Sequence, residues 1–291
     1  MKGSYILVAA FSISLLTACM RLDDNLYKPE KIDSYKFDAY EGPLSFRLDP
    51  TWSVPPSQIH LLRFYSGKEQ YRIYGIYIGD TLTIDRDTVI MYCHGNAKHM
   101  DNYWQRQKLL YARGKYGVLQ IDYRGYGLSE GKPSESGLIE DVDAALQWLK
   151  KRGLQPERLI IYGFSLGSIP ATALAVHPRS LAPSKLILEA PIGSIRTMVE
   201  DGAILTMAPE FYTDLETDNI ELIRSCRIPF MLLHGKRDFY LYIETHGAPI
   251  YANHPGPKKV FYRVEGADHE NLPAAMGFER YAAVIDSFIT H

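Results

Sequence analysis

Short runs of apolar residues alternate with helix-forming segments from Asp87 onward, and this alternation constrains the fold more than any other feature. The apolar runs are TVIMYC, GVLQI, RLIIY, KLILE, PFMLL and KKVFYRV. Continuous apolar runs of about four to eight residues are typical of strands that are covered on both faces. Strands that alternate with helices form parallel sheets with helices packed on either side. We therefore predict an α/β fold with a doubly wound, mostly parallel sheet.

The segments between these runs carry helix signals. In SESGLIEDVDAALQWLKKRG, the residues Leu138, Val142 and Leu149 share one face at helical spacing. Acidic residues stand near the start of this segment, basic residues stand near its end, and Gly153 follows. Further helices are predicted over residues 99–113, directly after Ser165, and over residues 273–289.

The composition excludes several classes of function. The 291 residues include 32 Lys and Arg and 34 Asp and Glu, with a formal net charge of −2. No basic face with interleaved aromatic residues is present, so we expect no nucleic-acid partner. The sequence has no His, Cys and Glu cluster at metal-ligand spacing, no phosphate-binding glycine loop and no dinucleotide fingerprint. We therefore expect neither a metal nor a cofactor.

The N-terminus, MKGSYILVAAFSISLLTAC, differs from the rest of the chain. Its apolar run from Tyr5 to Leu16 is shorter than the roughly 20 residues that span a bilayer and is typical of a signal-peptide core. Leu-Thr-Ala-Cys19 resembles the lipobox of bacterial lipoproteins, which implies a signal peptide over 1–18, acylation of Cys19 and anchorage in the bacterial cell envelope. Met20 favours the periplasmic side of the outer membrane if the host is Gram-negative. An ordinary secretory signal is the alternative.

The rest of the chain divides into a lead-in and one domain. Residues 19–58 are polar, rich in Pro, Tyr and Asp, and lack periodicity, so we predict a tether and an irregular lead-in. Residues 59–80 hold two aromatic and β-branched runs around Ser-Gly-Lys-Glu and predict an N-terminal β-hairpin. The globular domain is expected over 59–291. Within it, residues 193–225 should form a small cap insertion that either packs onto the sheet or lines a pocket.

The stretch GFSLG places Ser165 between two glycines. The five-residue pattern alone is weak, but here a predicted strand, RLIIY, precedes it and helix-forming residues follow it. In that context a serine is held on a sharp strand-to-helix turn with its hydroxyl exposed at the top of a sheet. Pro170 is compatible with the first helical turn, where its missing N–H removes no hydrogen bond. We therefore interpret Ser165 as a nucleophile rather than as part of a glycine-rich bend.

A serine nucleophile needs a base, and the base needs a carboxylate that orients it. Ligand sites in open parallel sheets lie beyond the carboxyl ends of the strands. At these ends PFMLLHGKRD supplies Asp238, and KKVFYRVEGADH supplies His269. Glu189, at the end of KLILE, is an alternative acid, and His254 is an alternative base.

Five motifs taken in order, CHGNA, DYRGYGLSEGKPSESGL, YGFSLG, LHGKRD and GADH, resemble the α/β-hydrolase-fold serine hydrolases. Within this group they are similar to the branch that holds acyl-protein thioesterases and monoacylglycerol-lipase-like enzymes. The resemblance implies hydrolysis of a small-molecule or lipid ester or thioester. A non-catalytic binding or assembly lipoprotein on the same scaffold is the alternative. The implied site consists of the catalytic residues Ser165, Asp238 and His269 and of oxyanion-hole N–H groups from Asn96 and Leu166.

Other polar residues are assigned structural places. Cys93 and Cys226 lie within or beside apolar runs and are predicted to be buried thiols rather than a disulfide. His246 is expected at the surface. After the nucleophile turn, Ser168 and Ile169 stand where members of the resembling family often have smaller residues. Structural roles are also expected for His94, His234, Asp122, Arg124 and Ser129.

Overall fold

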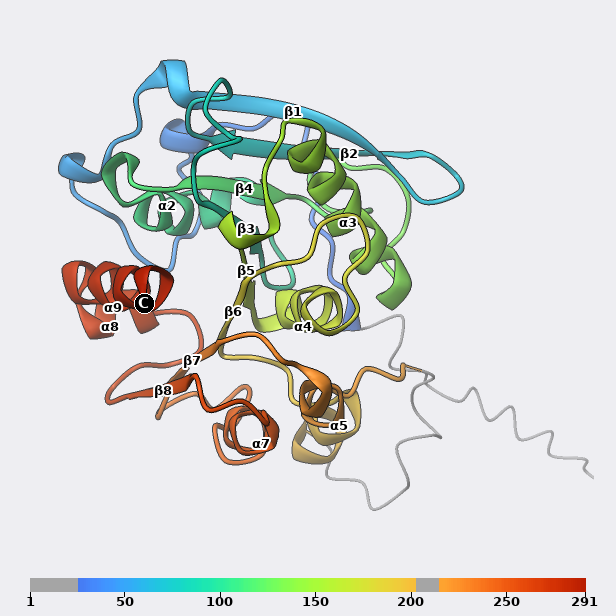
Figure 1. The fold of residues 1–291 in the computed structure, drawn as a ribbon, viewed down its shortest axis with the longest axis vertical. Coiled ribbons are helices and arrows are strands. Elements are labelled where there is room, and N and C mark those ends of the chain that lie inside the picture. Colours follow the sequence, from blue (N-terminus) through green and yellow to red (C-terminus); the bar gives the residue numbers. More distant parts are fainter. Residues whose placement is uncertain (1–25, 203–214) are drawn as a thin grey trace, which may run out of the picture.

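The computed structural model describes residues 26–202 and 215–291. Within these two ranges, eight strands form one sheet in the order β1-β2-β4-β3-β5-β6-β7-β8. The pairs β1–β2 and β2–β4 are antiparallel, and all other neighbours in the sheet are parallel. The predicted α/β fold, with a doubly wound, mostly parallel sheet and an N-terminal hairpin, is therefore confirmed (Figure 1).

Each predicted apolar run forms a strand. All residues of β3, β4, β5 and β7 are buried, which is why these strands read as continuous apolar runs without alternation. The edge strand β1 alternates more, because one of its faces reaches solvent. The strands are β1 (Ile59–Ser66), β2 (Tyr71–Ile78), β3 (Val89–Cys93), β4 (Gly117–Ile121), β5 (Leu159–Phe164), β6 (Lys185–Glu189), β7 (Phe230–Gly235) and β8 (Lys259–Val264).

Helices cover both faces of the sheet, each over its own apolar core (Figure 1). One face carries α3 (Glu135–Lys151), α4 (Ser168–Val176), α5 (Ile195–Gly202), α6 (Asn219–Leu222) and α7 (Gly247–Asn253). The other face carries α2 (Met100–Tyr111), α8 (Leu272–Met276) and α9 (Phe278–Thr290). Because the sheet is covered on both sides, its carboxyl edge is the place where loops can present functional groups.

The lead-in is irregular, as predicted, but from residue 26 it is not a free tether. Residues 26–58 contain short 3₁₀ turns and one isolated bridge, from Lys31 to Gly127, and most of their apolar side chains lie against the face that carries α2. The Asp101 carboxylate on α2 accepts hydrogen bonds of 2.8–3.0 Å from the backbone N–H groups of Lys36 and Phe37. Trp52 is buried in the core. Scattered aromatic residues, which leave no periodic signal, therefore attach this segment to the domain.

The predicted C-terminal helix over 273–289 is in fact two helices. Helices α8 and α9 are separated by Gly277, which has a φ of 88°. A residue in this left-handed region interrupts the helical hydrogen bonds, and glycine adopts it without a steric penalty. The helix predicted over 99–113 is α2 followed by a 3₁₀ turn over Ala112–Gly114.

The described part of the predicted cap packs onto the sheet. Ile195 and Val199 of α5 belong to the buried core beneath it. Residues 203–214, which hold most of the apolar side chains of the insertion, lie outside the described residues, as do the predicted signal peptide over 1–18 and Cys19. Across residues 26–202 and 215–291, no helix has the length and apolarity needed to cross a bilayer.

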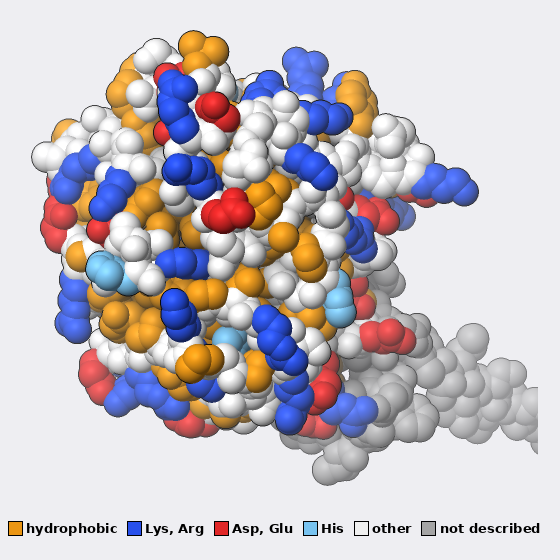
Figure 2. All heavy atoms as spheres, viewed as in Figure 1, with side chains coloured by type: hydrophobic (Ala, Val, Ile, Leu, Met, Phe, Trp, Pro, Cys, Tyr) orange, Lys and Arg blue, Asp and Glu red, His pale blue; other side chains and the backbone are white. Residues whose placement is uncertain are grey.

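Cationic and anionic side chains are interspersed over the face shown in Figure 2.

Candidate active site

Ser165 lies on a sharp turn between β5 and α4. Strand β5 ends at Phe164, a 3₁₀ turn covers Ser165–Gly167, and α4 begins at Ser168. Ser165 has a φ of 51°, in the left-handed region that residues with a side chain rarely adopt. Such a backbone costs on the order of 1–3 kcal/mol and persists only where the surrounding structure enforces it. The strained turn holds the Ser165 hydroxyl at the carboxyl edge of the sheet.

The two glycines of the turn are required by close packing. A Cβ atom on Gly167 would lie 2.0 Å from the carbonyl oxygen of Cys93, at the end of β3. A Cβ atom on Gly163 would lie 2.6 Å from the carbonyl oxygen of Gly167 and 2.8 Å from the Cβ atom of Ala171. Pro170 lies in the first turn of α4, as predicted. The Gly-x-Ser-x-Gly pattern therefore lets β3, β5 and α4 meet at Ser165.

The structure brings Ser165, His269 and Asp238 together from three strand ends. His269 follows β8, and its Nε2 is 2.9 Å from the Oγ of Ser165. Asp238 follows β7, and its Oδ2 is 2.8 Å from the Nδ1 of His269. An ionised carboxylate can only accept hydrogen bonds. The Nδ1 atom of His269 therefore carries a proton and donates a hydrogen bond to Asp238. The Nε2 atom of His269 is then free to accept the proton of the serine hydroxyl.

Asp238 is buried and richly hydrogen-bonded. Its Oδ1 accepts from the backbone N–H groups of Tyr240, at 2.9 Å, and Leu241, at 2.8 Å. Its Oδ2 lies 3.2 Å from the Nε2 of His234, in addition to its contact with His269. Burial raises the pKa of Asp238, but the hydrogen bonds from His234 and His269 outweigh it and hold this pKa well below its usual range. Asp238 is therefore ionised.

His234 has a larger part in the site than its predicted structural place suggested. Besides facing Asp238, its Nε2 lies 2.9 Å from the carbonyl oxygen of Leu241. It therefore joins the end of β7 to the loop that carries the acid. Its spacing of four residues from Asp238, within LHGKRD, is the one sequence signal that pointed to this contact.

Ser165 opens onto a pocket of about 350 Å³. Three aromatic side chains, Tyr103, Phe164 and Tyr240, form much of its wall, and the Tyr240 ring centroid lies 5.0 Å from that of His269. Glu270 is its acidic residue, and both Glu270 oxygens are 2.8 Å from the Nζ of Lys98. Among the described residues, the lining consists of Lys28, Asn96, Ala97, Lys98, Tyr103, Phe164, Ser165, Tyr240, His269 and Glu270.

The loop after β3 is held firmly beside Ser165. The side-chain oxygen of Asn96 accepts hydrogen bonds from the Tyr126 hydroxyl, at 2.6 Å, and from the backbone N–H of Lys28, at 3.0 Å. His94, which precedes this loop, is fully buried and stacks on Tyr123 with ring centroids 4.4 Å apart. Asn96 therefore lies in the pocket wall that the loop after β3 forms. The other predicted oxyanion-hole residue, Leu166, directly follows the serine in the turn.

The two alternative site residues lie elsewhere. Glu189 is bonded to Arg106, at 2.7 Å, and to the Tyr281 hydroxyl, at 2.8 Å. His254 is buried, and its Nε2 lies 3.0 Å from the carbonyl oxygen of Ile228. In the part of the chain that the structure describes, no hydrogen bond joins Glu189 to His269 or His254 to Ser165. In this structure Glu189 and His254 therefore stand apart from the chain of hydrogen bonds at Ser165.

His246, which was expected at the surface, is buried at the base of the cap. Its Nδ1 accepts the backbone N–H of Gly193 at 2.8 Å, and its Nε2 is 3.3 Å from the Oδ2 of Asp201 on α5. Burial lowers the pKa of His246 to about 4, so the ring is neutral at physiological pH. Ser168 likewise accepts the backbone N–H of Ile192 at 3.1 Å. The polar residue after the nucleophile turn thus ties α4 to the segment after β6.

The remaining polar residues shape loops, as expected. Arg124 forms 2.8 Å ion pairs with both Glu140 and Asp141 on α3. The hydroxyl of Ser129 donates to the carbonyl oxygen of Asp122 at 2.6 Å.

Cys93 and Cys226 are buried thiols that form no disulfide with each other, and burial raises the pKa of both. Over residues 26–202 and 215–291, no group of His, Cys, Asp and Glu side chains could hold a metal ion.

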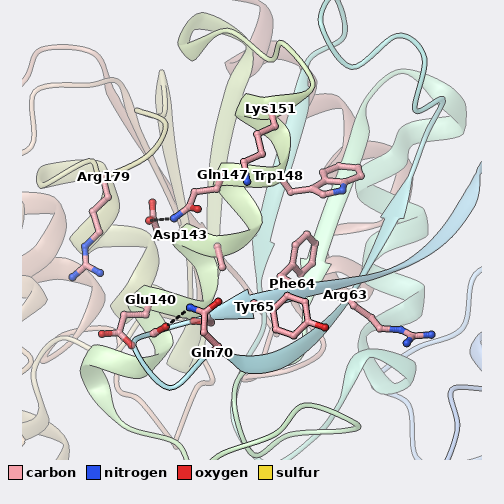
Figure 3. A pocket seen from close by; sticks show the side chains of 13 residues that line it. Arg63, Phe64, Tyr65, Gln70, Glu140, Asp143, Gln147, Trp148, Lys151 and Arg179 are labelled. Atoms are coloured by element: carbon pink, nitrogen blue, oxygen red, sulfur yellow. Dashed lines mark hydrogen bonds between the residues drawn. The ribbon is translucent and has the colours of Figure 1, made fainter.

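A larger pocket, of about 600 Å³, lies between the β1–β2 hairpin and α3 (Figure 3). Its polar side chains partly satisfy one another, as in the 3.2 Å hydrogen bond from Gln147 to Asp143. None of the described residues that line it is a histidine or a cysteine, and none of them lines the pocket at Ser165. The smaller pocket is therefore the candidate active site.

Comparisons with known proteins agree with this architecture. Residues 85–221 match the family described as serine aminopeptidase, S33. Alpha/beta hydrolase domain-containing protein 17C of Mus musculus is 31% identical over 204 residues, which are 69% of this chain and 59% of that protein. The 17B protein of Xenopus tropicalis is 31% identical over 203 residues, 69% of this chain and 66% of that protein. The chain thus spans less than two thirds of the length of these relatives.

Solved structures align over more of the chain. Esterase Pf2001 of Pyrococcus furiosus has a TM-score of 0.67 at 17% identity and covers 91% of this chain and 97% of its own. Esterase RhEst1 from Rhodococcus sp. ECU1013 has a TM-score of 0.62 at 18% identity and covers 79% of this chain and 98% of its own. At such identities the likeness concerns the fold. With its eight-stranded sheet and its serine turn after β5, this chain is a protein of the α/β-hydrolase fold.

Proposed function

We propose that the protein is a serine hydrolase that cleaves carboxylic esters or thioesters through an acyl-enzyme intermediate. The observation that carries the proposal is the unbroken hydrogen-bond chain from the Ser165 hydroxyl through His269 to Asp238, at the edge of a pocket. The strained backbone of Ser165 supports it, because residues held in such strained conformations cluster at active sites.

In the acylation step, the Oγ of Ser165 attacks the acyl carbon while its proton moves to the Nε2 of His269. The ionised Asp238 stabilises the imidazolium that results. Backbone N–H groups of Asn96 and Leu166 donate to the oxyanion, and one such donor lowers the barrier by roughly 3 kcal/mol. The imidazolium then protonates the leaving alkoxide or thiolate as its bond to the acyl carbon breaks.

Deacylation repeats these steps with water as the nucleophile. His269 takes one proton from the water molecule, and the oxygen attacks the acyl carbon of the ester on Ser165. Collapse of the second tetrahedral intermediate returns that proton to the Oγ of Ser165 and releases the carboxylic acid. The enzyme is thereby restored without any cofactor.

The pocket favours ester or thioester substrates over the peptides that the name of the matched family suggests. An aminopeptidase must bind a free α-ammonium group, for which a carboxylate is the natural partner. Within the part of the chain that the structure describes, Glu270 is the one acidic residue of the pocket lining, and it is already paired with Lys98 and accepts a hydrogen bond from Ser45. The aromatic walls from Tyr103, Phe164 and Tyr240 suit an apolar acyl group instead.

The proposal includes a lipid anchor on Cys19 and a place in the bacterial cell envelope, on the periplasmic side of the outer membrane if the host is Gram-negative. The sequence resemblance to a lipobox supports it. The described chain begins next to the pocket, because the Leu26 carbonyl accepts from Asn96 and Lys28 lines the pocket wall. Seven peptide units join Cys19 to Leu26 and span at most about 25 Å. An anchored enzyme would therefore hold its active site near lipid substrates.

A fluorophosphonate probe tests the nucleophile directly. The purified full chain should become labelled, and the Ser165→Ala variant should lose both the label and the hydrolysis of esters. Labelling that persists in this variant would rule out Ser165. A folded protein that neither takes up the probe nor cleaves any ester or thioester would favour the non-catalytic binding lipoprotein.

Two further measurements address the substrate and the anchor. Rates on ester and thioester series from acetyl to palmitoyl define the acyl group, and a short-chain optimum would argue against a lipid acyl substrate. Growth of cells with an alkyne-tagged palmitate should label the protein, and Cys19→Ala should abolish this label. A label that survives the substitution would contradict anchoring at Cys19.

A further inference from the structure

Arg106 is a buried cation to which the proposed mechanism gives no part. It lies on α2 with 4% of its side chain exposed, and its Nη1 is 2.7 Å from the Oε1 of Glu189 at the end of β6. The other Glu189 oxygen accepts hydrogen bonds from the hydroxyls of Tyr162 and Tyr281. Burial lowers the pKa of Arg106, but the adjacent Glu189 and the nearby tyrosine hydroxyls together outweigh it and hold this pKa well above its usual range. Arg106 is therefore charged, and Glu189 fixes its orientation.

The guanidinium of Arg106 contacts the chain next to both members of the reacting pair. Its Nη2 donates a 2.6 Å hydrogen bond to the carbonyl oxygen of Glu270, the residue after His269. Its Cζ lies 4.2 Å from the ring centroid of Phe164, the residue before Ser165. The same ring packs against the imidazole of His269, with centroids 5.4 Å apart. One side chain thus joins the segment that carries the nucleophile to the segment that carries the base.

Stability of the fold alone does not account for a charged pair at this place. Removing two charges from water often costs more than their attraction returns, and apolar residues of similar volume are often equally stable there. An apolar side chain on α2, however, has no donor for the carbonyl oxygen of Glu270. This carbonyl belongs to the turn after β8, where no neighbouring strand pairs with the chain. The guanidinium supplies the hydrogen-bond donor that no strand of the sheet provides to this carbonyl oxygen.

We propose that Arg106, held by Glu189, is a positioning residue for the hydrolysis. It sets the separation of His269 and Ser165 by holding the Glu270 carbonyl on one side and the Phe164 ring on the other. Arg106 does not touch the reacting atoms. This inference rests on the proposed function, since Ser165 and His269 are the pair that it positions.

The double variant Arg106→Met/Glu189→Gln tests the inference, because it leaves neither charge buried alone. The amide oxygen that replaces the Glu189 carboxylate can still accept from the hydroxyls of Tyr162 and Tyr281. Without the guanidinium, the Glu270 carbonyl and the Phe164 ring lose their common contact, so the imidazole of His269 can shift relative to Ser165. A displacement of about 1 Å from productive geometry costs on the order of 10²-fold in rate. We expect kcat and the rate of fluorophosphonate labelling to fall together by this factor while KM stays near the wild-type value and Tm falls by only a few degrees, because the Glu270 carbonyl loses one donor.

A second variant keeps the inference testable if the double variant does not fold. Arg106→Lys retains a charge opposite Glu189, but an ammonium lacks the rigid fork that serves two acceptors at once. We expect its kcat to lie between those of the double variant and the wild type. Arg113→Met is the matched control. Arg113 pairs with Glu279 away from the pocket, so its removal should leave kcat unchanged.

Two outcomes would overturn the positioning role. One is a folded double variant whose kcat and labelling rate stay within about twofold of the wild type, which amounts to no loss of transition-state stabilisation. The other is a lower Tm with an unchanged kcat per folded molecule, which would mark a purely structural ion pair. Failure of the proposed function is separate from both, because it shows as activity or labelling that survives Ser165→Ala.

Discussion

A methyl group added at Gly167 should disable the active site while leaving Ser165, His269 and Asp238 chemically intact. The new Cβ atom would lie 2.0 Å from the carbonyl oxygen of Cys93, a distance that must grow to at least 3.0 Å. The obstacle is backbone of β3, so no side-chain rotation can relieve it. The end of β3 and the serine turn must therefore separate by about 1 Å.

Two magnitudes follow from this separation. Overpacking of this kind costs about 1–3 kcal/mol, and each kcal/mol lowers Tm by roughly 2–4 °C in a protein of this size. Catalysis should suffer more, because the loop that follows β3 carries Asn96 and the turn carries Ser165. A shift of about 1 Å between such groups lowers kcat on the order of 10²-fold.

Thermal unfolding followed by circular dichroism and steady-state hydrolysis of a chromogenic ester measure both effects for Gly167→Ala. Gly277→Ala is the control, because a Cβ atom there meets nothing within 4 Å although its φ is 88°. That substitution has only the backbone cost, about 1–2 kcal/mol, and should leave kcat unchanged. A Gly167→Ala enzyme with wild-type Tm and kcat would refute the close-packing argument.

Two further predictions concern Asp238 and His246. Asp238→Asn should lower kcat on the order of 10⁴-fold in steady-state assays, because an amide permits the wrong tautomer of His269. A variant with nearly wild-type kcat would exclude Asp238 as the acid. The pKa of His246 is about 4 in the folded state against an ordinary 6.5. As the pH drops, the unfolded chain therefore binds a proton at His246 before the folded chain does, and the free energy of unfolding should fall between about pH 6.5 and about pH 4. Urea unfolding across this range measures the slope; His246→Gln should reduce it, and an unchanged slope would assign it to another group.

The strands were predictable because burial on both faces leaves a strong local signal. The runs that form β3, β5 and β7 are continuously apolar, and a doubly wound sheet explains why. The break between α8 and α9 was missed because a glycine at the end of a helix and a glycine within one look alike in sequence. Only the φ of 88° at Gly277 separates the two cases.

The packing of the lead-in was missed for a related reason. Tyr35 donates to Asp122, which is 87 positions away, and Asp101 accepts from Lys36 across 65 positions. Such contacts follow no period along the chain. A segment that is attached by single side chains therefore reads as an irregular tether.

Sequence alone determined the order of strands and helices and the candidates Ser165, Asp238 and His269, because periodicity and turn chemistry are local properties of the chain. Only the tertiary structure decided between the carboxylates of Asp238 and Glu189. Both follow parallel strands, but Asp238 reaches His269 whereas Glu189 pairs with Arg106, 83 positions earlier. Which buried charge meets which partner depends on distances across the sheet and on the cost of desolvation, and neither is written in the local pattern of residues.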